Sequence, residues 1–327
     1  MNQLLVPKNQ SGIHLKTFLM QWGLSASYWK ALKKARALFV NGLVTVWDIP
    51  LSANDRVSFP FLPEETDLVP EEGPLTILYE DEVLLAVHKE QGLLVHNSGL
   101  TQESSLSRRV LFYYREHGIK AALHPVSRLD RETSGIVLFA KNAALHHMLT
   151  KAPMKKLYLA LSHGPWEKFS GVIAQPIARK DGSLIERCVA PQGKPARTRY
   201  RVLWQDAAKS VVAFHLYTGR THQIRVHAAF MGHPLLGDTL YGAKGSQKAH
   251  ALHAMRLQFR HPLSGKDVKI TDPSLPFFLP ANKAFAPCIS KKKDERGREY
   301  DIMRTTFIDR RMYYATCNYE RHVQESL

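Results

Sequence analysis

Cysteines are scarce in this chain, and the three present form no motif. Cys188, Cys288 and Cys317 lie far apart among 327 residues, and no CxxC pair occurs. Zinc sites and disulfide frameworks need defined cysteine spacings, so this pattern argues against both and for a reducing compartment. No segment reaches the roughly 18 consecutive apolar residues that cross a membrane, and residues 1–8 lack the pattern of a secretion signal. We therefore expect a cytoplasmic protein with no membrane association.

The sequence also lacks the common motifs for cofactors, metals and hydrolysis. It contains no GxGxxG, no GxxxxGK[ST] and no GxSxG segment, which leaves dinucleotide binding, nucleoside triphosphate binding and a serine-hydrolase elbow without support. His222 and His227 are five residues apart, which is not the i, i+4 spacing of a helical zinc pair. We therefore expect neither a cofactor nor a metal ion.

Acidic residues are too few to balance the basic ones. The chain has 45 lysines and arginines against 29 aspartates and glutamates, a net charge of +16 at pH 7. An excess of this size attracts polyanions, most often nucleic acid. The alternative is a basic protein with an ordinary solvated surface. Charge alone therefore makes nucleic acid the first partner to consider.

Residues 1–60 have the pattern of a small domain with two short helices and a hairpin. Apolar residues at helical spacing predict a first helix that ends at Gly23, and Ser25 or Ser27 can cap a second one. An Asn-Gly pair after the second helix predicts a hairpin turn. This order of elements resembles the S4-type RNA-binding domain. The second helix and its end carry basic residues that form either a solvated face or an RNA-binding one: Lys30, Lys33, Lys34 and Arg36.

Composition divides the rest of the chain. Residues 60–74 hold four prolines and five acidic residues, which predicts a semi-rigid linker at 61–74. Residues 75–281 alternate strand-like runs with helical stretches and predict an α+β domain built on a large, mixed but mainly antiparallel sheet. Residues 282–327 form a charged tail to which the sequence assigns no role.

The most informative segment reads HPVSRLDRETSG and continues into five apolar residues, IVLFA. A continuous apolar run of this kind predicts a strand that is covered on both faces. Thr133, Ser134 and Gly135 predict a tight turn into that strand, since glycine allows a positive φ. Asp130 would then lie at the edge of the sheet, near solvent but held by rigid neighbours. Such a position suits a nucleophile or an acid–base residue.

Two further segments carry side chains suited to a site. In KLYLAL, the strand period places Tyr158 opposite the leucines and beside an alanine, where its ring can receive a planar partner or simply fill the core. In TGRTHQIRVHAAFMGHP, Thr221 can cap a helix near whose beginning lie Arg220 and Arg225, both suited to a carboxylate or phosphate. We expect Arg220 and His222 to contact RNA, with a structural role as the alternative for His222.

Taken together, these segments resemble the RluA-type pseudouridine synthases, a family that isomerises uridine in structured RNA. The resemblance extends from about Ile77 to Pro262, and the second and fifth of its segments are highly specific. In chain order the segments are ILYEDEVLLAVHKEQGLLVHNSG, HPVSRLDRETSGIVLFAKN, KKLYLALSHG, GKPARTRYRV, LYTGRTHQIRVHAAFMGHPLLGDTLYG and LHAMRLQFRHP. Ser127 departs from the pattern, because the family usually has histidine there. With Arg128 and Asp130 intact, we expect altered RNA contacts and retained activity.

The resemblance implies a pseudouridine synthase fold and a role for each matching residue. Asp130 corresponds to the essential aspartate, and Arg225 to the basic residue that pairs with it. Tyr158 corresponds to a tyrosine that stacks on the target base and can assist proton removal from C5. Arg128 corresponds to an arginine that holds the RNA around the extruded nucleotide. The reaction uses no redox group, metal or triphosphate, which agrees with the missing motifs.

Three functions are compatible with the sequence. The first is an RNA pseudouridine synthase acting on large-subunit ribosomal RNA, with transfer RNA as the alternative substrate and a monomer as the expected state. The second is a non-catalytic RNA-binding or ribosome-assembly factor, whose expected mark is the loss of Asp130 or Tyr158; both are present. The third is a glycoside hydrolase using Asp130 and Glu132, which lie only two residues apart, without sign of the opposed carboxylates such enzymes need. The motifs favour the first.

Overall fold

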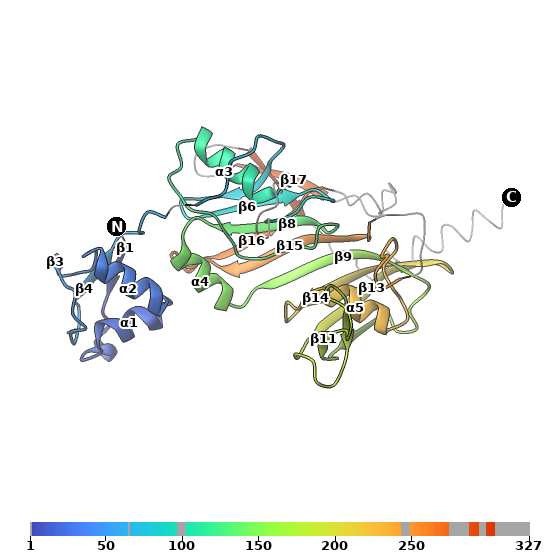
Figure 1. The fold of residues 1–327 in the computed structure, drawn as a ribbon, viewed down its shortest axis with the longest axis horizontal. Helices are drawn as coiled ribbons and strands as arrows, with labels where there is room; N and C mark the ends of the chain where they lie inside the picture. Colours follow the sequence, from blue (N-terminus) through green and yellow to red (C-terminus); the bar gives the residue numbers. More distant parts are fainter. Residues whose placement is uncertain are drawn as a thin grey trace.

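The protein consists of an N-terminal unit with a small sheet and a larger body built on one long sheet (Figure 1). The structure is a computed structural model, which describes residues 2–64, 66–96, 103–242, 249–274, 288–293 and 299–304. The predicted tail at 282–327 is described only in β17 (Cys288–Lys293) and β18 (Glu299–Arg304), which pair with each other. Its other residues, including Cys317, lie outside the described ranges.

In the N-terminal unit, two helices cover a four-stranded sheet of order β1-β4-β2-β3. The first helix ends at Gly23 as predicted, with φ at 117°, because that left-handed conformation suits glycine. Ser25 caps the second helix by accepting a hydrogen bond from the N–H of Tyr28 at 3.1 Å. The predicted hairpin joins β2 to β3. The elements are β1 (Asn2–Leu5), the 3-10 turn η1 (Lys8–Gln10), α1 (Leu15–Trp22), α2 (Ala26–Lys34), β2 (Phe39–Val40), β3 (Leu43–Val44) and β4 (Arg56–Phe59).

The large sheet has ten strands, with β10-β13-β14-β9-β15-β8-β6-β5 as its main path, β16 beside β15 and β7 beside β8. Among the described strands, β15 and β8 form its parallel pair and all its other pairs are antiparallel. The predicted α+β class with a mainly antiparallel sheet is therefore confirmed. Its strands are β5 (Thr76–Glu80), β6 (Leu84–Lys89), β7 (His124–Pro125), β8 (Ser134–Ala140), β9 (Lys155–His163), β10 (Ser170–Ile173), β13 (Thr198–Gln205), β14 (Lys209–Leu216), β15 (Leu252–Arg260) and β16 (Asp267–Thr271).

Three helices and a short hairpin complete the body. The helices are α3 (Leu106–Glu116), α4 (Ala143–Lys151) and α5 (Gln223–Phe230), and the hairpin consists of β11 (Ile177–Arg179) and β12 (Arg187–Val189). No helix within the described ranges is long and apolar enough to span a membrane. In the same ranges, no three His, Cys, Asp or Glu side chains are grouped so that they could hold a metal ion.

Every residue of β8 is buried, because its two faces pack against different helices (Figure 1). Val137 and Phe139 belong to a core that includes residues of α3, whereas Ile136 and Leu138 belong to a core that includes residues of α4. The predicted strand with two covered faces is therefore confirmed. It begins at Ser134, two residues before the apolar run.

Gly135 allows β8 to approach β15 closely. Its φ is 109°, and a Cβ atom built on it would lie 2.4 Å from the carbonyl oxygen of Ala254. The close approach occurs where β8 and β15 pair in parallel, at His253 and Ala254. A side chain here would both strain the backbone and collide with a backbone atom that cannot move freely.

We expect Gly135→Ala to destabilise the fold much more than Gly182→Ala does. Gly182 also has a positive φ, of 73°, but a Cβ there would meet no atom within 4 Å. The control should cost about 1 kcal/mol from backbone strain alone, and Gly135→Ala at least about 2 kcal/mol more. Denaturant unfolding of both variants measures the difference. Equal losses would show that the contact with Ala254 does not constrain β8.

Candidate active site

Asp130 lies in the loop that leads into β8, and backbone hydrogen bonds fix the shape of this loop. The N–H of Thr133 donates to the carbonyl oxygen of Asp130 at 3.0 Å and closes a turn. The N–H of Gly92, just after β6, donates to the carbonyl oxygen of Arg131 at 3.0 Å. The loop is therefore attached to a neighbouring segment, and the side chain of Asp130 is 29% exposed. This agrees with the expectation of an accessible carboxylate with rigid neighbours.

Lys89, the last residue of β6, is a buried amine that braces the same loop. It is fully buried, and its Nζ donates to the carbonyl oxygens of Glu90, Leu93 and Arg131 at 2.9, 2.8 and 2.8 Å. Burial lowers the pKa of Lys89 to about 7, against the opposing effect of nearby carboxylates. The third of these carbonyls belongs to the residue after Asp130, so Lys89 helps to hold the carboxylate in place.

Arg225, on the first turn of α5, joins Asp130 to a second carboxylate. Its Nη1 donates to Oδ2 of Asp130 at 3.1 Å. Its Nε and Nη2 donate to the two carboxylate oxygens of Asp238, each at 2.8 Å, and the Asp238 side chain is fully buried. The structure therefore brings Asp130 and Arg225 together as expected and adds Asp238 as the partner that orients the guanidinium.

The charges in this group stabilise one another. Burial alone would raise the pKa of Asp238, but the hydrogen bonds and charge of Arg225 outweigh it and hold that pKa below its ordinary value. Burial alone would lower the pKa of Arg225, yet Asp238 and Asp130 raise it above its ordinary value. At neutral pH the guanidinium is therefore a cation and Asp238 an anion.

Tyr158 lies on β9 and is 8% exposed. It is directly opposite Phe214 on β14 and Ala254 on β15, within one apolar core. Burial raises the pKa of Tyr158 well above its ordinary value, and the negative charge of Asp130 raises it further. The phenol is therefore protonated at neutral pH. Ala254 beside it has a small side chain and leaves room next to the ring. The sequence pattern had predicted this role for Ala160.

His222 occupies the N-cap position of α5 in an unusual backbone conformation. Its φ is 56°, in the left-handed region that costs a non-glycine residue about 1 kcal/mol or more. Its Nδ1 is hydrogen-bonded to the hydroxyl of Tyr241 at 2.7 Å, and its Nε2 lies 3.8 Å from Oδ2 of Asp130. Burial lowers the pKa of His222. The prediction that Thr221 caps this helix was wrong by one residue, because the N-cap is His222. Thr221 is exposed and lies before the helix.

Two other predicted residues are exposed on the segments that build the site. Arg128 lies two residues before Asp130 and is exposed. Arg220 is also exposed, and its Nε donates to the carbonyl oxygen of Pro195 at 3.0 Å. Both cations are therefore available at the surface next to the residues that hold Asp130.

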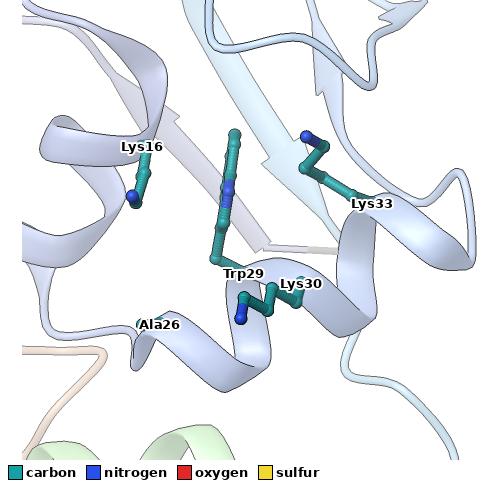
Figure 2. A pocket seen from close by; sticks show the side chains of 5 residues that line it. All are labelled: Lys16, Ala26, Trp29, Lys30 and Lys33. Carbon is teal, nitrogen blue, oxygen red and sulfur yellow. The ribbon is translucent and has the colours of Figure 1, made fainter.

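Two of the predicted basic residues of the N-terminal unit, Lys30 and Lys33, line a separate pocket on α1 and α2. Figure 2 shows the ring of Trp29 standing between Lys16 and Lys33. The Nζ of Lys33 lies 5.7 Å from the centre of the ring. Lys34 and Arg36 are exposed nearby in the chain. The cavity has a volume of about 350 Å³ and is lined by Lys16, Ala26, Trp29, Lys30 and Lys33.

Sequence reasoning missed Asp238, Lys89 and Lys16. Asp238 follows Leu235, Leu236 and Gly237, and a carboxylate just after a short apolar stretch was the available signal. Lys89 likewise follows a strand-like apolar run, and a charged residue at that position was the available signal. Nothing in the sequence indicated that the carboxylate would meet Arg225 or that the lysine would face backbone carbonyls.

Comparisons with known proteins identify the family of the chain. Residues 83–230 match the RNA pseudouridylate synthase family. A Bacillus subtilis protein described as an uncharacterized RNA pseudouridine synthase is 39% identical over 222 residues, covering 66% of this chain and 78% of that protein. The ribosomal large subunit pseudouridine synthase D of Haemophilus ducreyi is 33% identical, covering 64% and 70%. The solved structure of human RNA pseudouridylate synthase domain containing 4 has a TM-score of 0.51 at 25% identity, covering 62% and 89%.

The fold and these matches define an enzyme that modifies RNA by isomerisation. The chain belongs to the RNA pseudouridine synthase family. The class of enzyme expected from the sequence is thereby confirmed.

We expect Asp238→Asn to destabilise the protein by about 3–5 kcal/mol at pH 7, because it leaves Arg225 buried without its main partner. Glu186→Gln, which alters the surface pair of Glu186 with Lys180, should change stability little. Since the pKa of Asp238 is lowered in the folded state, the stabilisation is complete above its ordinary pKa and is lost as the pH falls through the folded value. Denaturant unfolding at several pH values tests both points. A loss no larger than that of Glu186→Gln would contradict the role of this pair.

Proposed function

We propose that Asp130 is the essential catalytic carboxylate of this pseudouridine synthase and that Arg225 and Tyr158 support it directly. The observation that carries the proposal is the 3.1 Å hydrogen bond from Arg225 to Asp130, with Asp238 fixing the guanidinium from behind. Such a carboxylate is oriented by a cation and partly open to solvent. It is therefore ready to meet a nucleoside that leaves its helix.

The reaction rearranges bonds within one nucleotide. The bond from N1 of uracil to C1′ of the ribose breaks, the ring turns, and a bond from C5 to C1′ forms while C5 loses its proton and N1 gains one. No atom or electron is gained or lost overall. Asp130 supplies the anionic oxygen at the reacting nucleoside. Because the phenol of Tyr158 is protonated, its direct contribution is an aromatic surface for the uracil rather than a ready base.

The target nucleotide must leave its stack, at a cost of a few kcal/mol. Stacking of an aromatic ring on the extruded base stabilises it by about 1–3 kcal/mol and offsets this cost. Tyr158 is an aromatic residue close enough to Asp130 for that carboxylate to raise the pKa of its phenol. Arg128 and Arg220, which are exposed, are proposed to hold the phosphates on either side of the extruded nucleotide, and the neutral ring of His222 to contact the RNA beside Asp130.

We further propose large-subunit ribosomal RNA as the substrate, with transfer RNA as the alternative. The net charge of +16 and the similarity to the large-subunit enzyme of Haemophilus ducreyi support this choice. Residues 1–60 are proposed as an S4-like RNA-binding domain, 61–74 as a linker and 75–281 as the catalytic domain. The protein is proposed to act as a cytoplasmic monomer. The basic pocket on α1 and α2 supports an RNA-binding role for the N-terminal unit.

We expect Asp130→Asn to abolish catalysis and leave RNA binding nearly intact. Tritium release from RNA labelled at C5 of uridine should fall by at least about 1,000-fold, whereas the Kd should change little because phosphate contacts supply most of the affinity. Glu132→Gln on the same loop is the matched control and should retain most activity. Unmodified ribosomal and transfer RNA are assayed separately, which also identifies the substrate class. Full activity of Asp130→Asn would overturn the assignment; no release by the wild type, with binding retained, would favour the RNA-binding factor.

Removing three charges from α2 should weaken RNA binding without changing the chemistry. For Lys30→Gln, Lys33→Gln and Lys34→Gln combined, the slope of log K against log salt should fall by about 2–3, since each lost phosphate contact removes roughly 0.7–0.9. The rate at saturating RNA should stay the same. A control protein carries the same change at three exposed lysines of the body, Lys168, Lys209 and Lys266. Identical slopes in the two proteins would remove α2 from the binding surface.

A further inference from the structure

Glu64, in the segment between the two units, makes a set of hydrogen bonds with the body. Its Oε2 is bonded to Nε2 of His124 at 2.7 Å. Its Oε1 accepts from Nδ2 of Asn142 at 3.0 Å and from the N–H of Ala143 at 2.9 Å. Both carboxylate oxygens are therefore used, and the partners lie on β7 and at the start of α4. This segment is bound to the body at Glu64 and does not behave as a simple spacer.

Tyr28 makes the same connection from the side of the N-terminal unit. It lies on α2 and is 7% exposed. Its hydroxyl accepts from the N–H of Leu62 at 2.9 Å and from Nδ2 of Asn142 at 3.3 Å. Asn142 is also buried, and its Oδ1 caps α4 by accepting from the N–H of Ala144 at 2.8 Å. One amide thus contacts α2, the connecting segment and α4. We call Tyr28, Glu64, His124 and Asn142 the clamp.

Apolar packing supports the clamp. Ala144 of α4 is fully buried in the core of the N-terminal unit, and Phe61 packs against the cores of both units. Met148 of α4 lies so close to Gly23 that a Cβ there would be 2.8 Å from its Cγ. Figure 1 shows α4 as the part of the body nearest to α1 and α2. The two units therefore share an interface and are not connected by the chain alone.

The clamp connects the two regions that we propose to touch RNA. On one side it holds α2, which carries Lys30 and Lys33. On the other it holds His124, six residues before Asp130 in the same segment. If the units moved freely, a bound RNA could present any uridine within reach of the tether. A fixed arrangement accepts only a uridine at one spacing from the RNA segment bound by α2.

We propose that the clamp determines which uridine is modified, by fixing the distance and orientation between the RNA-binding surface of α2 and Asp130. This rests on the proposed function and extends it. Glu64 and Tyr28 are positioning residues in this scheme, since neither touches the reacting nucleotide. Loss of the clamp should change the choice of site and leave the chemical step unchanged.

The test compares Glu64→Ala, the conservative variant Tyr28→Phe, and the control Glu72→Ala, which removes an exposed carboxylate from the same segment. The first probe is an unmodified transcript of large-subunit ribosomal RNA, or of transfer RNA if the wild type acts there. Every pseudouridine formed is mapped by sequencing. The second probe is a short hairpin transcript that carries only the preferred uridine and its loop, too short to reach α2. Its rate is measured by tritium release in a single turnover.

With Glu64→Ala, the ratio of modification at the preferred uridine to that at all others should fall about tenfold, which corresponds to about 1.4 kcal/mol. The rate on the short hairpin should stay within about twofold of the wild type. Tyr28→Phe, which removes one hydroxyl and keeps the ring, should shift the ratio in the same direction by less. Glu72→Ala should change neither.

Three results would overturn the proposal. An unchanged site ratio in both folded variants would show that the clamp has no part in target choice. A parallel loss of rate on both probes would indicate a structural role only, as would a selectivity loss that appears only in a variant with reduced melting temperature. Failure of the proposed function itself is recognised separately, by an Asp130→Asn variant that remains active or by a wild type that is inactive on both RNA classes.

Discussion

The site depends on a single buried guanidinium shared by two carboxylates. Arg225 gives two parallel hydrogen bonds to Asp238, which is sealed from solvent, and one to Asp130, which is not. The bidentate pair fixes the plane of the guanidinium, and the N–H groups of the third nitrogen, Nη1, must then donate within that plane. The orientation of Asp130 therefore follows from Arg225, which lies 95 residues away in sequence. The buried anion is stabilising only while the cation is present, so the three side chains function as a unit.

The backbone around these three side chains also helps to hold Asp130 in place. Lys89 satisfies three carbonyl oxygens, one of them in the Asp130 loop, and Gly135 lets the following strand lie against β15. The loop thus has little freedom before RNA arrives. Preorganised groups of this kind stabilise developing charge without having to reorient during the reaction. The proposed RNA-binding surface of α2, positioned by Glu64, would complement this rigid placement of Asp130.

Local patterns predicted the local structure well. The apolar run after Asp130 indicated a strand with two covered faces, and Gly23 marked the end of α1, because periodicity and glycine conformations act over a few residues. Local patterns did not predict the contacts between distant segments. The pairing of Arg225 with Asp130 came from a family resemblance, and Asp238 was not identified at all. Spacing along the chain carries no information about which carboxylate meets which cation across a sheet. The error at Thr221 has a local cause: His222 adopts a conformation that favours glycine or asparagine.

Arg225 gives two hydrogen bonds to Asp238 and one to Asp130, and this arrangement affects the local charge as well as the orientation of Asp130. One guanidinium between two carboxylates leaves the group Asp130, Arg225 and Asp238 with one more acidic than basic side chain, in a protein whose net charge is +16. Under the proposed function, a nucleic acid is drawn to the protein by its phosphates, yet the carboxylate of Asp130 repels phosphates from the proposed catalytic centre. Only an uncharged portion of the strand can occupy that centre without electrostatic penalty. If Asp130 is the catalytic carboxylate, this charge distribution favours entry of the uncharged base over entry of the phosphate backbone.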